Sequence, residues 1–273
     1  MKIASWNVNS VKARLPAVID WLETAAPDVL ALQEIKCTAD TFPFFEIEAA
    51  GYRATVLGQK TYNGVALISK SAPESVLEGL PDDGGDDEQA RYVEAVFDGV
   101  RVASIYLPNG NPVESDKFPY KLCWMARLKR HAARLLADEI PTVLGGDFNV
   151  IPEPEDCYDP DDWTGDALYR PESRRAFREI LYLGWVDAFR SLHARRSGAF
   201  TFWDYQRGRW QRGEGIRIDH LLLSPAALDR LEECDIDTIP RSRPKASDHT
   251  PIWCSLAPAP PTGDLFGCHG SEA

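Results

Sequence analysis

The stretch VLGGDFNVIP, residues 143–152, decides the fold, because it carries an apolar strand directly into two polar side chains. Side chains of a strand alternate between its faces, so Asp147 and Asn149 are expected to point the same way while Phe148 packs into the core. The Gly145–Gly146 pair allows a neighbouring backbone to approach closely. Asp and Asn are also common turn residues, so the stretch alone fits either a turn or a functional site.

Five further strand-like stretches also deliver polar side chains at an end or edge. They are SWNVNS (5–10) with Asn7 and Asn9, LALQEIK (30–36) with Glu34, ASIYLPNG (103–110) with Tyr106 and Asn109, IRIDHLL (216–222) with Asp219, and KASDHTPIW (245–253) with Asp248 and His249. A carboxylate among apolar residues is costly to bury without a partner. Because six separate strands place polar groups in this way, we expect these groups to converge on one site.

The chemistry of these groups suits hydrolysis of a phosphodiester. Glu34 and Asp248 are hard oxygen ligands of the kind that Mg²⁺ prefers, and the sequence has no cysteine–histidine cluster that would favour zinc. Asp147 is the natural base for a water nucleophile. A buried Asp219 would hold an imidazole in the form that donates a hydrogen bond. The donors available to a phosphate whose charge builds during in-line attack are Asn7, Tyr106, Asn149 and His249.

The composition is that of an ordinary globular protein: of 273 residues, 44% are hydrophobic and 26% are charged. No apolar run approaches the roughly 20 residues that a membrane span requires. The first ten residues, MKIASWNVNS, lack the features of a signal peptide, so a cytoplasmic location is expected. The six cysteines are scattered without CxxC spacing, which favours reduced thiols over a disulfide framework or a zinc site.

The net charge of −12 argues at first against a nucleic-acid partner. The charge is unevenly spread, however: five acids fall within residues 82–88 and six within 153–162, whereas seven arginines fall between Arg190 and Arg217. An acidic protein can therefore still present a basic face. Taken alone, the arginine run is explained by a solvated surface loop. A surface that contacts DNA is the alternative, and the aromatic residues interleaved with the arginines suit it.

Hydrophobic periodicity indicates many short strands and few helices. Amphipathic helices are predicted over residues 11–24, 115–137 and 172–183. This pattern is typical of two packed sheets with helices outside them. We expect one domain over residues 1–257, a hairpin loop at 82–88, and a loosely ordered tail over 258–273 that has lost all periodicity. Strands are predicted over residues 2–8, 28–33, 53–58, 64–69, 92–97, 100–106, 142–147, 200–203, 217–223, 234–239 and 250–256.

The ordered motifs resemble the exonuclease III (apurinic/apyrimidinic endonuclease) family of the endonuclease/exonuclease/phosphatase superfamily. The resemblance covers residues 1–257 and implies a four-layer α/β sandwich of two mainly antiparallel sheets flanked by helices. The motifs that carry it are SWNVNSVKAR (5–14), LALQEIK (30–36), YNGVALISK (62–70), YLPNG (106–110), GGDFNVIP (145–152), DAFR (187–190), FTFWDYQRGRWQRGEGIRID (200–219), RIDHLLLS (217–224) and SDHTPI (247–252).

The resemblance also implies roles for individual residues. Glu34 resembles the metal-binding glutamate, with Asn7, Asn9 and Asp248 near the same ion. Asp147 resembles the proposed water activator, although a role as the acid for the leaving group has also been suggested. Tyr106, Asn7 and Asn149 resemble groups that orient the phosphate or the carboxylate, and Asp219 and His249 match an Asp–His pair. A second metal position could involve Asp147, Asn149 and His249.

Contacts to DNA are implied for a further set of positions. Phe202 and Trp203 fall where relatives line a pocket for a flipped-out sugar without a base, and Ile216 and Ile218 complete that wall, although packing in the core explains these residues too. The eukaryotic relative has tryptophan at the position of Ile216, so the balance between abasic sites and ordinary 3′ ends stays open. The expected DNA-binding residues are Lys12, Asn109, Phe202, Trp203, Ile216, Arg217 and Ile218.

The sequence thus predicts a monomeric Mg²⁺-dependent nuclease of DNA repair, with Mn²⁺ as a possible substitute. It would cut 5′ to abasic sites in double-stranded DNA and clear nucleotides or blocking groups from 3′ ends. One alternative is another phosphatase or phosphodiesterase of the superfamily. Another is a DNA-binding relative without activity, which would require the loss of a central residue.

Overall fold

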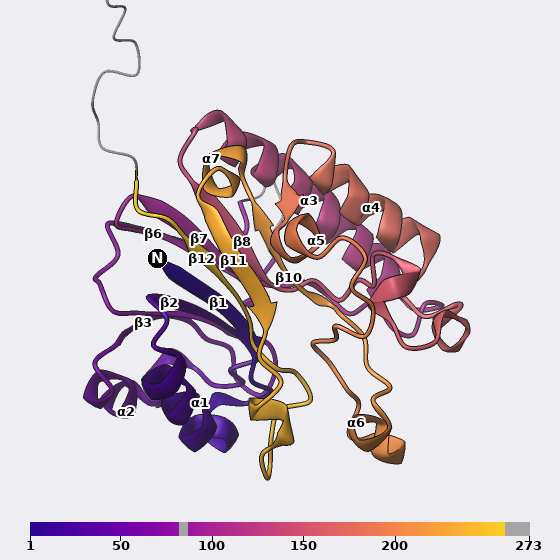
Figure 1. Ribbon diagram of the computed structural model, residues 1–273, viewed down its shortest axis with the longest axis horizontal. Helices are drawn as coiled ribbons and strands as arrows, with labels where there is room; N and C mark the ends of the chain where they lie inside the picture. Colours follow the sequence, from indigo (N-terminus) through magenta and orange to yellow (C-terminus); the bar gives the residue numbers. More distant parts are fainter. Residues whose placement is uncertain (82–86, 260–273) are drawn as a thin grey trace, which may run out of the picture.

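Two six-stranded β-sheets pack face to face in the computed structural model, which describes residues 1–81 and 87–259 (Figure 1). The first sheet has the order β11(Leu231–Ile236), β12(Ile252–Leu256), β1(Lys2–Asn7), β2(Val29–Gln33), β4(Val65–Ser69), β3(Arg53–Leu57). The second has the order β5(Ser75–Glu78), β6(Tyr92–Phe97), β7(Val100–Tyr106), β8(Thr142–Asp147), β10(Asp219–Leu223), β9(Val186–Asp187).

The two sheets share one pairing pattern. In each, the central pair of strands is parallel, β1 with β2 and β7 with β8, and the other four pairs are antiparallel. The sheets are therefore mixed and mainly antiparallel, as predicted. Because a parallel pair ends at one edge, each sheet brings two strand ends together at its centre.

Helices cover the outer face of each sheet, which gives four layers (Figure 1). Helices α1(Val11–Ala25) and α2(Phe44–Ala49) pack on the first sheet, and α3(Lys117–Ala137) and α4(Pro171–Leu181) pack on the second. Strand β2 shows why the layers form. Its residues Val29 and Ala31 join the core between the sheets, whereas Leu30 and Leu32 join the core under α1. Both faces are apolar, so β2 is buried throughout.

The three long helices and most strands confirm the sequence-based predictions to within a few residues. The predicted strand at 200–203 is wrong: there Phe202 forms only isolated bridges, to Ile216 and to His249. Strand β5 escaped prediction because all four of its residues are exposed and show no alternation. The two-residue β9 and the short helices α5(Ala188–Leu192), α6(Arg209–Arg212) and α7(Pro225–Leu228) are too brief for periodicity to detect.

The acidic segments are not simply solvated. Asp87 pairs with Arg127 at 2.7 Å and accepts hydrogen bonds from Tyr120, although residues 82–86 lie outside the described part of the chain. Strands β5 and β6, on either side of this segment, pair antiparallel, but the predicted hairpin loop at 82–88 falls mostly outside the described residues. The predicted loose tail over 258–273 falls mostly outside them as well.

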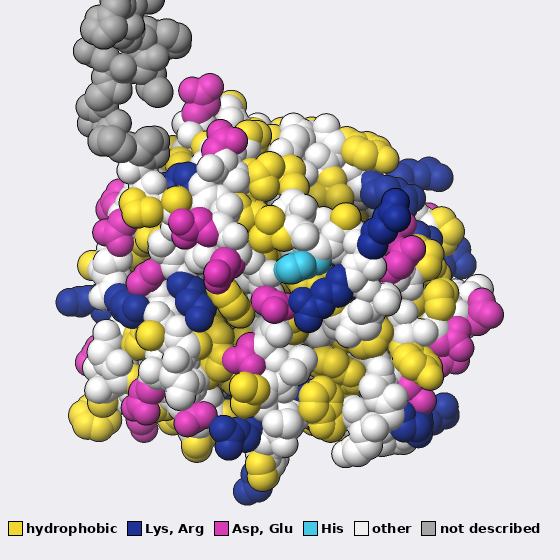
Figure 2. Space-filling view, viewed as in Figure 1, with side chains coloured by type: hydrophobic (Ala, Val, Ile, Leu, Met, Phe, Trp, Pro, Cys, Tyr) yellow, Lys and Arg dark blue, Asp and Glu magenta, His cyan; other side chains and the backbone are white. Residues whose placement is uncertain are grey.

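The five described cysteines are free thiols, as the spacing predicted. In residues 1–81 and 87–259, no helix combines the length and apolar character needed to cross a bilayer. Basic and acidic side chains are interspersed over the face drawn in Figure 2.

Much of the arginine run is neutralised by acids of the same chain. Five of its seven members form ion pairs. Three of these arginines, Arg190, Arg209 and Arg217, pair with acids of the run at 153–162, and Arg217 also pairs with Asp187. Arg217 is the extreme case, since its side chain is fully buried and contacts Asp156 at 2.8 Å and Asp187 at 2.7 Å. The expectation that Arg217 contacts DNA is therefore wrong, because its charge is used inside the fold.

Replacement of Arg217 should test this buried network. Arg217→Met leaves Asp187 without its arginine partner and Asp156 with Arg190 alone, and an uncompensated buried charge of this kind costs about 3–5 kcal/mol of unfolding free energy. Urea unfolding would measure the loss. Arg196→Met is the matched control, because its pair with Asp235 is exposed and should contribute less than about 1 kcal/mol. Equal effects of the two substitutions would contradict the structural role of Arg217.

Candidate active site

The site lies at the edge where the central strands of both sheets end. Asn7 ends β1 and pairs in register with Gln33 of the parallel β2, so Glu34 follows at the same level. In the second sheet Tyr106 of β7 lies opposite Asp147 of β8, and Asp219 of the antiparallel β10 lies opposite Asp147 on the other side. Five strands thus place polar groups at one edge, as the sequence predicted.

The glycine pair allows β8 to occupy this position. A Cβ atom on Gly146 would lie 2.0 Å from the carbonyl oxygen of Ile105 in β7, and one on Gly145 would lie 3.0 Å from a side-chain carbon of Leu221 in β10. No residue with a side chain fits at Gly146 without moving β7. The close approach predicted for the pair is confirmed.

Asn149 reaches the site through a turn and not through strand alternation. Strand β8 ends at Asp147, whose Oδ1 accepts a hydrogen bond of 2.9 Å from the backbone N–H of Asn149. Asn149 has a φ of 48°, in the left-handed region that Asn tolerates better than most residues. The prediction that strand alternation aligns Asn149 with Asp147 is therefore wrong, because a turn places Asn149. Phe148 is fully buried, as predicted.

The same turn occurs at the end of β1. Oδ1 of Asn7 accepts a hydrogen bond of 3.0 Å from the backbone N–H of Asn9, whose φ is 44°. Val8, between them, is fully buried. The motifs NVN and DFN thus form two copies of one side-chain-to-backbone turn, one on each sheet. The stretch DFN is therefore both a turn and part of the site.

One amide joins the two sheets across the site. The Nδ2 group of Asn7 donates to Oε1 of Glu34 at 2.9 Å and to Oδ2 of Asp147 at 3.0 Å. Asn7 is fully buried and Asp147 is 2% exposed. Glu34 adopts a φ of 50°, which turns its side chain toward this amide. The two carboxylates are therefore held near each other although they come from different sheets.

Asp219 and His249 form the expected pair. The Nδ1 atom of His249 lies 2.8 Å from Oδ2 of Asp219, and its Nε2 atom lies 3.8 Å from Oδ2 of Asp147. Burial alone would lower the pKa of His249, but the carboxylate of Asp219 raises that pKa to about 10. His249 is therefore an imidazolium at neutral pH, and Nε2 is free of Asp219 to donate toward the pocket.

The neighbouring acids titrate differently from one another. Burial raises the pKa of Asp147 to about 7, although the positive charge of His249 opposes the rise. Burial acts in the same direction on Glu34, but hydrogen bonds from Lys36 and Asn7 outweigh it and lower its pKa. Burial raises the pKa of Tyr106 well above its ordinary value, so this phenol stays protonated as a donor. A group that titrates near neutral pH is suited to proton transfer.

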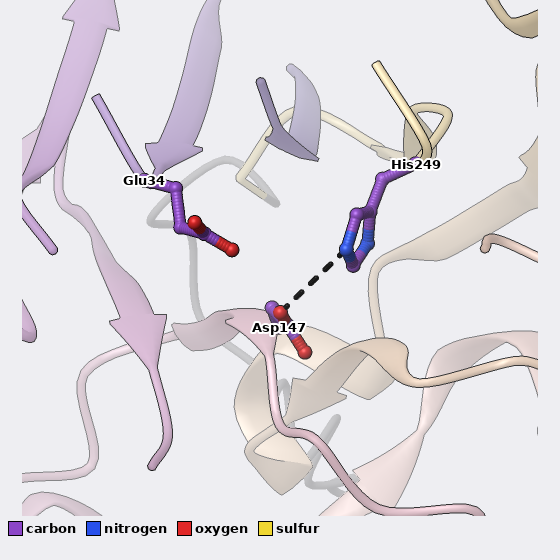
Figure 3. Close-up of side chains that lie close together, drawn as sticks. All are labelled: Glu34, Asp147 and His249. Carbon is purple, nitrogen blue, oxygen red and sulfur yellow. Dashed lines mark ion pairs between the residues drawn. The ribbon is translucent and has the colours of Figure 1, made fainter. Parts of the chain in front are cut away.

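Glu34, Asp147 and His249 point toward one another and form a group that could hold a divalent metal ion (Figure 3). Their potential ligand atoms all lie within 4.8 Å of each other. The charge on His249 favours the two carboxylates as the ligands, because an imidazolium has no lone pair to offer. Two hard oxygen donors fit the requirements of a Mg²⁺-type ion.

Asp248 and Asn9 are linked to this group through hydrogen bonds and an ion pair of Lys36. The Nδ2 atom of Asn9 donates to Asp248 at 3.1 Å, and its Oδ1 atom accepts from Lys36 at 2.6 Å. Lys36 also pairs with Glu34 at 2.9 Å. The lysine thus bridges Glu34 to the Asn9–Asp248 pair that was expected to share its ion. Lys36 lies in the motif LALQEIK, but the sequence does not show which way its side chain points, so this contact could not be predicted.

A pocket of about 310 Å³ opens over these groups. Its polar wall includes Glu34, Tyr106, Asp147, Asn149 and His249. Its apolar wall consists of Phe202 and Ile218, as expected, and also of Trp163 and Leu168, which the sequence did not single out. These last two come from a segment without periodicity, so no sequence signal marked them.

The other expected DNA contacts are placed differently. Asn109 lines the same pocket and Lys12 is exposed on α1. Ile216 is buried behind the pocket wall in a cluster with Ile218. Trp203 is 5% exposed and packs edge-to-face on Trp210, so it does not line this pocket.

Comparison with known proteins agrees with this geometry. Residues 4–249 match the model of the endonuclease/exonuclease/phosphatase family. The chain therefore belongs to that family, which defines the class of its fold and site.

Three relatives resemble this chain in sequence or structure over nearly its whole length. Exodeoxyribonuclease III of Haemophilus influenzae is 33% identical over 94% of this chain and all of that protein. An AP endonuclease from Archaeoglobus fulgidus superposes with a TM-score of 0.89 and 37% identity, over 94% of this chain and 99% of that one. The 3′ phosphatase NExo from Neisseria, solved with a product DNA hairpin, gives a TM-score of 0.91 and 39% identity over the same shares.

The charge on His249 can be tested directly. Asp219→Asn removes the largest of the charges that raise the pKa, so the pKa of His249 should fall from about 10 toward its ordinary value of about 6.5, with only Asp147 and Asp248 left to oppose burial. NMR titration of the imidazole nitrogens in the metal-free protein would measure the shift. Asp204→Asn, which removes another acid from the pocket wall, is the control and should leave that pKa near its wild-type value.

The raised pKa of His249 also predicts how the unfolding free energy depends on pH. A raised pKa in the folded state stabilises the fold fully below the unfolded pKa, and this contribution is lost as pH rises through the folded value. The wild type should therefore lose unfolding free energy from about pH 7 to about pH 10 by more than Asp219→Asn does. Parallel pH profiles for the two proteins would contradict the assignment.

Proposed function

We propose that this chain is a Mg²⁺-dependent nuclease of DNA repair. It hydrolyses the phosphodiester 5′ to abasic sites in double-stranded DNA, and it removes nucleotides and blocking groups from 3′ ends. A cytoplasmic monomer with its catalytic domain over residues 1–257 forms part of this proposal, and Mn²⁺ is a possible substitute for Mg²⁺. The observation that carries it is the Asn7 amide, which holds Glu34 and Asp147 together beside a charged Asp219–His249 pair.

The residues of the pocket divide the work. Glu34 and Asp147, with Asn9 and Asp248 nearby, would hold the ion. Mg²⁺ bound there would supply charge neutralisation for the phosphate and the leaving oxygen. Asp147 stands between ionised and protonated at neutral pH, so it can take a proton from water or give one to the leaving group.

Donors surround the position of the phosphate. His249 donates from Nε2 with a full positive charge, and the Tyr106 hydroxyl donates as a neutral phenol. Such fixed donors stabilise a charge that grows in the transition state more than the ground-state phosphate. The alternative of an inactive DNA-binding relative finds no support, because all of the central residues are present and in contact.

The pocket supports a nucleic-acid substrate over a small head group. Phe202 and Ile218 offer an apolar wall suited to the face of a sugar without a base. Asn109, which lines the pocket, and Lys12, which is exposed on α1, are candidate contacts to phosphates. The names of the relatives, an exodeoxyribonuclease, an AP endonuclease and a 3′ phosphatase bound to DNA, point in the same direction.

The direct test is a duplex with one abasic site, incubated with Mg²⁺ or with chelator. We expect a nick 5′ to the abasic site with the metal and none with chelator. A duplex with a 3′-phosphate should lose the phosphate under the same conditions. Failure of the wild type to act on either duplex with Mg²⁺ would refute the proposed function.

Replacement of Asp147 tests its role in proton transfer. Asp147→Asn should lower the rate of cleavage by about 10²–10⁴-fold, the usual contribution of a positioned acid or base. DNA binding, measured by fluorescence anisotropy, should stay near that of the wild type. Asp204→Asn is a control from the same pocket wall and should cleave normally. Loss of binding together with cleavage would show that the role of Asp147 is misassigned.

A further inference from the structure

Lys121 is a charged residue that the proposed chemistry does not use, yet it lies fully buried beside the site. It belongs to α3, on a face otherwise occupied by apolar side chains such as Phe118, Trp124 and Met125. A buried ammonium is costly unless its donors are all satisfied.

The ammonium group of Lys121 binds three backbone carbonyl oxygens. They belong to Asn149 at 2.6 Å, Asn109 at 3.1 Å and Ala167 at 3.2 Å. Burial lowers the pKa of Lys121 to about 7, against the opposing charges of Asp166 and Asp147. The three acceptors match the three N–H donors of its ammonium form. The stem of the lysine passes close to Gly110, where a Cβ atom would lie 2.7 Å from its Cδ atom.

The three carbonyls come from three separate loops that line the pocket. Asn149 follows β8, Asn109 follows β7, and Ala167 lies between Asp166 and Leu168, both of which line the pocket. Other hydrogen bonds join these loops in pairs, whereas Lys121 contacts all three. The backbone N–H of Ile151 donates to the carbonyl of Leu168 at 2.9 Å. Asn109 Nδ2 donates to Asn149 Oδ1 at 2.9 Å, and Asn111 bonds to Asp166 and to the backbone of Ala167.

We infer that Lys121 is a positioning residue for the phosphate-binding groups: its ammonium fixes the backbone of Asn149, Asn109 and the 166–168 segment relative to one another. The Asn149 side chain completes the arrangement, because its Nδ2 atom donates to the carbonyl of Leu107 at 2.9 Å. Backbone and side chain of Asn149 are thus both fixed from outside its own turn. The inference rests on the proposed function for its effect on turnover, but the arrangement itself does not.

Kinetics on the DNA that the wild type cleaves give the first test. In Lys121→Met, kcat should fall by about 10²-fold, the effect expected from a misplacement of roughly 1 Å. KM for the DNA should change much less, because most contacts to the duplex remain. Lys129→Met is the matched control, since Lys129 lies on the same helix but pairs with Glu179 at the surface. A wild-type kcat in Lys121→Met would overturn the inference.

NMR gives a test that does not depend on activity. The side-chain amide resonances of Asn109 and Asn149 should shift in Lys121→Met and stay in place in Lys129→Met. Lys121→Gln, which keeps two N–H donors, serves if the methionine variant is too unstable to study. Unmoved resonances would overturn the positioning role. If the wild type cleaves no DNA, the proposed function fails, and this measurement still decides the role of Lys121.

Chemical rescue separates positioning from the filling of space. Lys121→Ala lacks three carbons and the ammonium, which n-propylammonium supplies as a free ion. Adding this ion should restore kcat in part and return the Asn149 resonance toward its wild-type position. Propanol, which has similar volume but a single donor, should not. Equal recovery with both compounds would show that volume alone matters and would overturn the assignment.

Discussion

The amide of Asn7 is the contact on which the rest of the site depends. It is a neutral group with two N–H donors, and it stands between carboxylates that come from different sheets. Two acids this close would otherwise repel each other, and burial makes that repulsion stronger. By donating to both, the amide lets a negatively charged site exist between two apolar layers, ready for a cation or a phosphate with its counter-ion.

The matching turns after β1 and β8 explain how two sheets build one site. Each sheet ends its central parallel pair in the same way, with a side-chain oxygen that accepts from the backbone two residues later. Asn9, Glu34, Lys36 and Asn149 all have positive φ angles, which cost free energy outside glycine. Such strain persists where the surrounding structure fixes it. Here Glu34 and Asn149 line the pocket, and Asn9 and Lys36 bond to each other beside it.

The sequence correctly predicted the layers of the fold and most residues of the site. It was less successful for the way in which those residues reach the site. Apolar runs such as VLAL in β2 leave little choice of structure, and a polar residue at the end of each run marks a shared edge. Strand alternation, however, does not explain the position of Asn149, because the strand ends at Asp147 and a turn that Asp147 itself stabilises carries Asn149. Arg217 and Lys121 were also beyond reach: the sequence shows a charge, but only tertiary packing shows whether its partners are inside the fold.

The position of β12 has a consequence for how the protein is made. This strand lies between β11 and β1 in the first sheet, so residues near the end of the described chain complete a sheet begun by the first seven. The preceding loop delivers His249 to the site. During synthesis on the ribosome, the first strand gains this neighbour only after all the other described strands have been made. Nuclease activity would thus be absent from any nascent or truncated chain that ends before β12.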